Sequence, residues 1–132
     1  MLGENIIPDE RGRVVGTRVL PDGKIEFTFQ TSGKILDVEF NNTGTIVNSP
    51  RPGGLLFGEG QGVAMTKDGE IITWTAQGIG KPTGRGLASS FRESVYLQTQ
   101  SERLARINSV AVVVEAEFDE NGNVQAKLWE WK

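Results

Sequence analysis

The chain has 132 residues with 17 glycines, five prolines and a net charge of −3, and it contains neither histidine nor cysteine. Its length suits one domain over 1–132 with one hydrophobic core. The missing residue types exclude disulfides, thiolate catalysis, serine–histidine triads and zinc sites built from cysteine or histidine. The sequence has no basic stripe of the kind that binds nucleic acid. It has no apolar run long enough to span a membrane, and its first residues lack the apolar stretch of a signal peptide. A cytoplasmic protein without a cofactor or metal is therefore expected.

Turn signals recur about every ten to fifteen residues, and the stretches between them are rich in β-branched and aromatic residues, which is typical of antiparallel β proteins. The clearest strand lies at 24–31, where Ile25, Phe27 and Phe29 alternate with polar residues. An all-β fold is expected, a single antiparallel barrel of eight strands, or nine if no short early strand merges with its neighbour. The expected strands are 13–20, 24–31, 34–40, 44–48, 55–66, 70–79, 88–99 and 110–118, with 123–131 as the ninth.

The segment 101–108 is the only one that reads as helical. It begins with Ser101 in a position suited to an N-cap, and Leu104 and Ile107 follow three residues apart. A short helical connector of at most two turns is expected there, covering one end of the sheet.

Asp68-Gly69 stands between two alternating strands and predicts a two-residue hairpin, because a type I′ turn needs positive φ at both central positions. In that register Met65 lies opposite Ile72 and Val63 opposite Trp74. These four bulky side chains need burial, so their face is expected to be the core face.

The same register directs Glu59 and Gln61 into the core and leaves Gly58, Gly60 and Gly62 on a flat outer face. These glycines do not match a dinucleotide fingerprint or a P-loop, because the spacing is wrong and no helix follows. Sharp coiling of the strand to close a barrel is the preferred explanation of the glycine face, and a contact between subunits is the second.

Asn121-Gly122 predicts a second two-residue hairpin, which pairs Val114 with Trp129 and Val112 with Trp131 on an apolar face. The opposite face, expected to be solvated, carries Glu115, Glu117, Ala126, Leu128 and Glu130. A bulge at the turn would shift the register by one residue and reverse these assignments.

The candidate site is an interior pocket with Trp74 as an apolar wall. Burial raises the pKa of a carboxyl group, so an inward Glu59 would suit a general acid or base. The alternative is an inert group at the barrel mouth or paired with an arginine. Arg92, Tyr96 and Gln98 share one face of 91–100, and the sequence leaves open whether that face points inward. The ligand-binding candidates are Glu59, Gln61, Val63, Met65, Trp74, Arg92, Tyr96 and Gln98, with Glu59 and Tyr96 as catalytic candidates.

Four motifs resemble a family of small uncharacterised prokaryotic proteins with the pattern GxGxGVxMTxDGE, then TWxxxGxG, then KLAxLN and KLWEWK. They are GEGQGVAMTKDGE (58–70), TWTAQGIGKPTGRG (73–86), SERLARINSVAVVVEAEFDENGN (101–123) and KLWEWK (127–132). The resemblance implies no activity. In its fold the chain also resembles the eight-stranded barrels of allene oxide cyclases and plant dirigent proteins, which implies an apolar ligand inside the barrel and assembly into dimers or trimers.

The expected function is binding of a small hydrophobic or amphipathic molecule inside the barrel. One alternative is a cyclase or isomerase that uses the same cavity, with positioning and one carboxylate in place of histidine or cysteine. Another is a structural, oligomeric barrel filled by side chains. The first two predict a cavity of roughly 300 Å³ or more, and an eight-stranded barrel can be hollow or filled. The sequence does not identify the ligand, the reaction or the oligomeric state.

Overall fold

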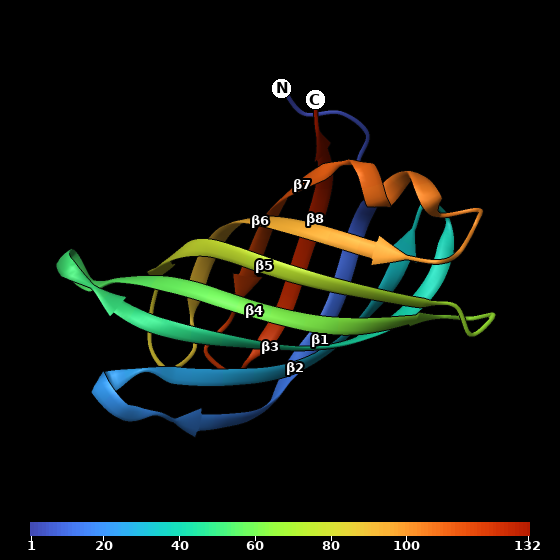
Figure 1. Ribbon diagram of the computed structural model, residues 1–132. Coiled ribbons are helices and arrows are strands. Elements are labelled where there is room, and N and C mark those ends of the chain that lie inside the picture. Colours follow the sequence, from blue (N-terminus) through green and yellow to red (C-terminus); the bar gives the residue numbers. More distant parts are fainter.

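Eight segments rich in β-branched and aromatic residues each pair with their neighbours in the chain and close into one antiparallel barrel (Figure 1). This computed structural model describes all residues 1–132. The eight-stranded fold is confirmed, and the segment expected as a ninth strand is the eighth. The strands are β1 (Ile7–Val19), β2 (Ile25–Ile35), β3 (Val38–Arg51), β4 (Leu55–Thr66), β5 (Ile71–Pro82), β6 (Ser89–Thr99), β7 (Ala111–Phe118) and β8 (Asn123–Trp131).

The turn between β2 and β3 lies at Leu36-Asp37, where the sequence gives no turn signal. Both residues have positive φ, 47° and 68°, and Ile35 pairs with Val38, as in a type I′ hairpin. Leucine is unusual there, because positive φ is rare outside glycine, asparagine, aspartate and histidine. The prediction of separate strands at 34–40 and 44–48 was therefore wrong.

The β4–β5 hairpin has a three-residue turn. Gly69 N–H donates to Thr66 O and Thr66 N–H donates to Glu70 O, both at 2.9 Å, and Gly69 has φ 85°. This is a turn followed by a left-handed glycine bulge, and it shifts the predicted register by one residue. Met65 pairs with Ile71 and Val63 with Thr73. Since side chains alternate across a strand, the predicted inner face of β4 lies outside.

The β7–β8 hairpin differs from its prediction in the same way. The Asp119 carboxylate accepts hydrogen bonds from the backbone N–H groups of Asn121 and Asn123, both at 2.9 Å, and Gly122 has φ 84°. Val114 therefore pairs with Leu128, and the prediction that it faces Trp129 was wrong. The residues on the inner face are Val112, Val114, Ala116, Phe118, Val124, Ala126, Leu128 and Glu130, while Trp131 is exposed.

The glycines of β4 line the inner wall, where large side chains of the barrel lie against them. A Cβ atom at Gly62 would lie 2.3 Å from the Trp74 ring, and one at Gly60 would lie 2.6 Å from the Ile46 side chain. Gly80 on β5 likewise leaves space for a large side chain, since a Cβ atom added there would lie 2.5 Å from the Phe91 ring. The prediction of a flat outer glycine face was wrong, and the glycines instead allow large side chains to fill the interior.

We expect Gly62→Ala to lower the free energy of unfolding by about 1–3 kcal/mol, because its methyl group would overlap the rigid Trp74 indole. Gly16→Ala on β1 is the matched control, since no atom lies within 4 Å of the added Cβ, and its effect should stay within about 0.5 kcal/mol. Urea unfolding measures both. In a Trp74→Ala background the cost of Gly62→Ala should largely vanish, and an undiminished cost there would contradict this explanation.

The connector between β6 and β7 closes one end of the barrel. It contains a 3-10 helix, η3 (Ala105–Ser109), and the buried side chains Leu104 and Ile107 are 1% and 0% exposed. Ser101 is not an N-cap, because its hydroxyl donates to the Glu70 carboxylate instead. The two termini lie beside each other at the barrel wall, where Leu2 pairs with Trp131 (Figure 1). None of the helices is long and apolar enough to cross a membrane.

Candidate functional site

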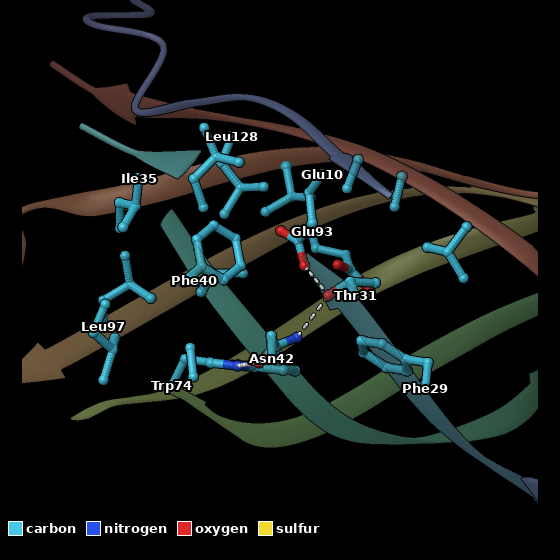
Figure 2. A pocket seen from close by; sticks show the side chains of 18 of the residues that line it. Glu10, Phe29, Thr31, Ile35, Phe40, Asn42, Trp74, Glu93, Leu97 and Leu128 are labelled. Carbon is cyan, nitrogen blue, oxygen red and sulfur yellow. Dashed lines mark hydrogen bonds between the residues drawn. The ribbon is translucent and has the colours of Figure 1, made fainter. Parts of the chain in front are cut away.

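The inner faces of the strands enclose a cavity of about 80 Å³, lined by 20 residues of which 16 are hydrophobic. Its volume is well under the roughly 300 Å³ expected of a ligand pocket. Figure 2 shows Phe29, Phe40, Leu97 and Leu128 around it, with the polar side chains gathered in one region. The barrel is therefore largely filled, and the cavity of roughly 300 Å³ or more that was predicted for ligand binding or catalysis is not formed. A small apolar cavity with one polar region remains.

A chain of hydrogen bonds runs through the polar region and joins four strands. The Trp74 indole N–H donates to Asn42 Oδ1 at 2.7 Å, and Asn42 Nδ2 donates to the Thr31 hydroxyl at 3.1 Å. The Thr31 hydroxyl in turn donates to the Glu10 carboxylate (Figure 2). Every donor points toward Glu10, so the chain ends on a carboxylate oxygen that is fixed in position.

A second carboxyl group, that of Glu93 on β6, lines the same cavity near Glu10 (Figure 2). Burial raises the pKa of Glu93 to about 7, and the nearby Glu10 charge adds to this increase. Burial also raises the pKa of Glu10, which is 8% exposed, although hydrogen bonds from Thr31 and Asn42 act in the opposite direction. Glu93 can therefore hold, give and accept a proton near neutral pH, beside a second carboxyl group whose pKa is also raised.

Of the eight residues expected to line the pocket, only Trp74 faces the interior. The seven on the outer face are Glu59, Gln61, Val63, Met65, Arg92, Tyr96 and Gln98. Glu59 is exposed and accepts only a 3.4 Å hydrogen bond from Gln77, so the inward placement of Glu59 was wrong. The one-residue shift at Gly69 explains the four β4 residues, because it reverses the whole strand.

The orientation of 91–100, left open by the sequence, places Phe91, Val95 and Leu97 inside together with Glu93. Arg92, Tyr96 and Gln98 therefore point outward, and Tyr96 is 56% exposed. Tyr96 and Glu59 both point outward and do not share a cavity, so the expected catalytic pair is not assembled.

Sequence reasoning missed the polar residues of the cavity, Glu10, Thr31, Asn42 and Glu93. Glu93 had a usable signal, because it alternates with Phe91 and Val95 on a single face. Asn42 lay in what looked like a turn, and Glu10 lay before the expected start of the first strand at residue 13. These two could not be placed without the strand boundaries.

A second hollow of about 310 Å³ lies on the outside of the wall between β6, β7 and β8. Arg92, Glu115 and Trp129 line it, and Glu93 and Val114 contribute both to this hollow and to the interior cavity. A single layer of strand therefore separates the outer hollow from the cavity at Glu93.

Comparison with solved structures identifies barrels of the same fold. A conserved protein of unknown function from Rhodopseudomonas palustris matches with a TM-score of 0.81 and 13% identity, covering 98% of this chain and 97% of that one. A protein with unknown function from Clostridium acetobutylicum matches at 0.83 and 15%, covering 98% of both chains. A β-barrel-like protein from Acinetobacter baumannii matches at 0.81 and 12%, covering 98% and 96%. No family model and no curated protein sequence matches the chain. At these identities the likeness establishes the fold alone.

Proposed function

We propose that the barrel binds a small amphipathic molecule in its interior cavity. The observation that supports this function is the cavity itself, with its apolar walls and a few convergent polar groups at one place. Ligand sites in proteins are commonly built in this way. The apolar part of the molecule would contact Phe40 and Leu97, and its polar group would lie at Glu10 and Glu93.

The size of the cavity limits the ligand. Its volume of about 80 Å³ is roughly half that of an engineered apolar cavity of about 150 Å³ that holds benzene. The ligand that fits without rearrangement is therefore smaller than benzene, about four or five non-hydrogen atoms. A dissociation constant near 1 mM, about 4 kcal/mol, is realistic for so small a molecule.

The test uses 1-butanol as a probe and a variant that fills the cavity. Ala126 lines the cavity and pairs with Glu10, so Ala126→Leu should occupy the space where the probe binds. We expect millimolar 1-butanol to raise the melting temperature of the native protein and of Lys127→Leu, an outward control on the same strand, but not of Ala126→Leu. A native protein that responds neither to 1-butanol nor to n-butylamine would contradict the proposal.

An isomerase or cyclase is the alternative function, and the two carboxyl groups favour it. Isomerisation needs one group that gives a proton and one that takes a proton, and groups held in different environments suit those roles. Glu93, with its pKa of about 7, would be the donor, and Glu10, held by Thr31, the acceptor. Conversion of a bound compound by the native protein, lost in Glu93→Gln, would distinguish this function from binding alone.

The resemblance to allene oxide cyclase and dirigent barrels agrees with ligand binding and remains an inference from the sequence, as does a cytoplasmic location. A dimer or trimer also stays a prediction. The glycines of β4 no longer support it, because they face the interior and cannot form a contact between subunits. The outer surface of β4, β5 and β6 instead exposes Val63, Met65, Ile71 and Tyr96, each at least 43% exposed. Aromatic residues and methionine are enriched in subunit interfaces.

A further inference from the structure

Glu10, which is buried, and Glu93, which is partly buried, line the interior cavity without any positively charged partner. The chain has 14 Lys and Arg residues, and all of them are exposed. Ionised groups buried in proteins are normally paired with an opposite charge, because transfer of a lone charge out of water is costly. In the free protein, binding of a proton by the carboxyl groups avoids the cost of a buried negative charge. A positively charged ligand would avoid the same cost by neutralising that charge.

Other charged groups near the pair already have partners or lie beyond the wall. Glu130, the third glutamate on the inner face, is held by Arg106 at 2.6 Å near the closed end of the barrel. Across the β6–β7 wall, Arg92 is 3.5 Å from Glu117, and Glu115 is exposed. The inner faces of β2, β3, β4, β5 and β7 present no titratable group to the cavity. No cation of this chain can therefore neutralise Glu10 and Glu93.

The hydrogen-bond pattern also indicates a donor. The Trp74 N–H is bound to Asn42, and the Thr31 hydroxyl is bound to Glu10. Glu93 accepts no hydrogen bond from the barrel, so its oxygens and the remaining lone pairs of Glu10 are acceptors without donors. A ligand group that carries several N–H donors and a positive charge complements such a pair.

We infer that the ligand of this cavity is a small amine, whose ammonium group lies between Glu10 and Glu93 while its apolar body contacts the walls. This inference rests on the proposed function and narrows it to a class of molecule. A divalent metal ion does not fit the same oxygens, because it needs more ligands than two carboxylates supply, and no group of three or more acidic residues is assembled anywhere in the chain. A carboxylate ligand is excluded by charge repulsion.

The test compares n-butylamine, 1-butanol and propionate, which have the same number of non-hydrogen atoms but are positive, neutral and negative. Calorimetry gives the affinities, and the NMR signal of the Trp74 indole N–H shows whether binding occurs in the cavity. At pH 8 we expect the amine to bind at least tenfold more tightly than the alcohol, with no binding of propionate. At pH 5.5 the ratio should approach one, because protonated Glu93 must release its proton before it can hold an ammonium group.

Glu93→Gln should abolish the preference for the amine while the alcohol still binds, and Glu115→Gln, an exposed control across the wall, should leave the ratio unchanged. Equal binding of amine and alcohol at pH 8 would overturn this inference and leave the proposed function intact. An amine preference that survives Glu93→Gln would also overturn it. A failure of all three probes to bind would instead remove the proposed function.

Discussion

Between pH 5 and pH 8 the free energy of unfolding should fall by about 2.5 kcal/mol. The folded-state pKa of Glu93 is raised to about 7 from 4.5, so the folded protein holds a proton that the unfolded chain releases. Stability from this proton is fully present below the unfolded pKa and is lost as the pH rises through the folded pKa. The whole interval between 4.5 and about 7 corresponds to about 3 kcal/mol, most of which is lost between pH 5 and pH 8.

The other carboxyl groups with shifted pKa values either add to this loss of stability at higher pH or affect stability only below pH 5. The pKa of Glu10 is also raised by burial, so it adds to the loss of stability at higher pH. The pKa values of three other carboxyl groups are lowered by hydrogen bonds. Glu70 accepts them from Ser101 and Arg103, Glu130 from Arg106, and Asp119 from Asn123. Their stabilisation is lost only as the pH falls below about 4.5. Maximum stability is therefore expected near pH 5.

Urea unfolding at pH 5, 6, 7 and 8 measures this dependence. Glu93→Gln keeps the shape of the side chain but cannot ionise, so its stability should change much less over this range. Glu115→Gln, on the exposed face of β7, should retain the full dependence of the native protein. A native protein whose stability is constant from pH 5 to pH 8 would show that Glu93 is ionised and solvated in the fold.

The barrel itself was predictable, because strand number depends on turns and on alternation, and both are local signals. Phe27 and Phe29 were expected on one face, and both are buried. The closing strand, β8, was visible as an alternating segment after Asn121-Gly122. A turn signal locates a hairpin even when its exact length is unknown, so the topology does not depend on that length.

The site was not predictable, because each inward residue depends on turn length to within one residue. Asp68-Gly69 and Asn121-Gly122 fit both a two-residue turn and a three-residue turn with a glycine bulge. The hydrogen bonds that select the longer turn at Asn121-Gly122 include those of the Asp119 carboxylate. Because β4 is reversed, Gly60 faces the interior where Glu59 was expected. The glycines of β4 therefore leave space for Trp74, and Glu59 has no role in the pocket.

The interior is divided into a filled part and a hollow part. Phe118 lies at the boundary, because it lines the cavity and also contacts three other rings, those of Phe27, Phe29 and Phe91, with centroid distances of 6.0, 6.4 and 5.6 Å. This aromatic cluster fills space that would otherwise extend the cavity. The small volume of the cavity is therefore a result of side-chain choice, and an eight-stranded barrel of this kind can hold a larger molecule if the cluster is reduced.

Phe118→Ala should lower the free energy of unfolding by about 3–5 kcal/mol, because it removes a buried ring and leaves a void beside its three aromatic neighbours. Urea unfolding measures the loss. Tyr96→Ala removes a ring that is 56% exposed on the outer face, and it should cost much less. Because a domain of this size has a total stability of about 5–15 kcal/mol, the measurement is best made near pH 5, where the native protein is most stable.

The same variant tests whether the cavity is confined by Phe118. In Phe118→Ala the void joins the existing cavity, and an apolar space of that kind stays dry and binds benzene. We expect benzene at ten times its dissociation constant to recover about 1.4 kcal/mol of stability in Phe118→Ala and none in the native protein or Tyr96→Ala. If benzene stabilises the native protein equally, the cavity already accommodates larger ligands and the limit on ligand size drawn from its volume is wrong. If Phe118→Ala folds but gains nothing from benzene, the neighbouring rings have collapsed into the void, and the cluster does not set the size of the cavity.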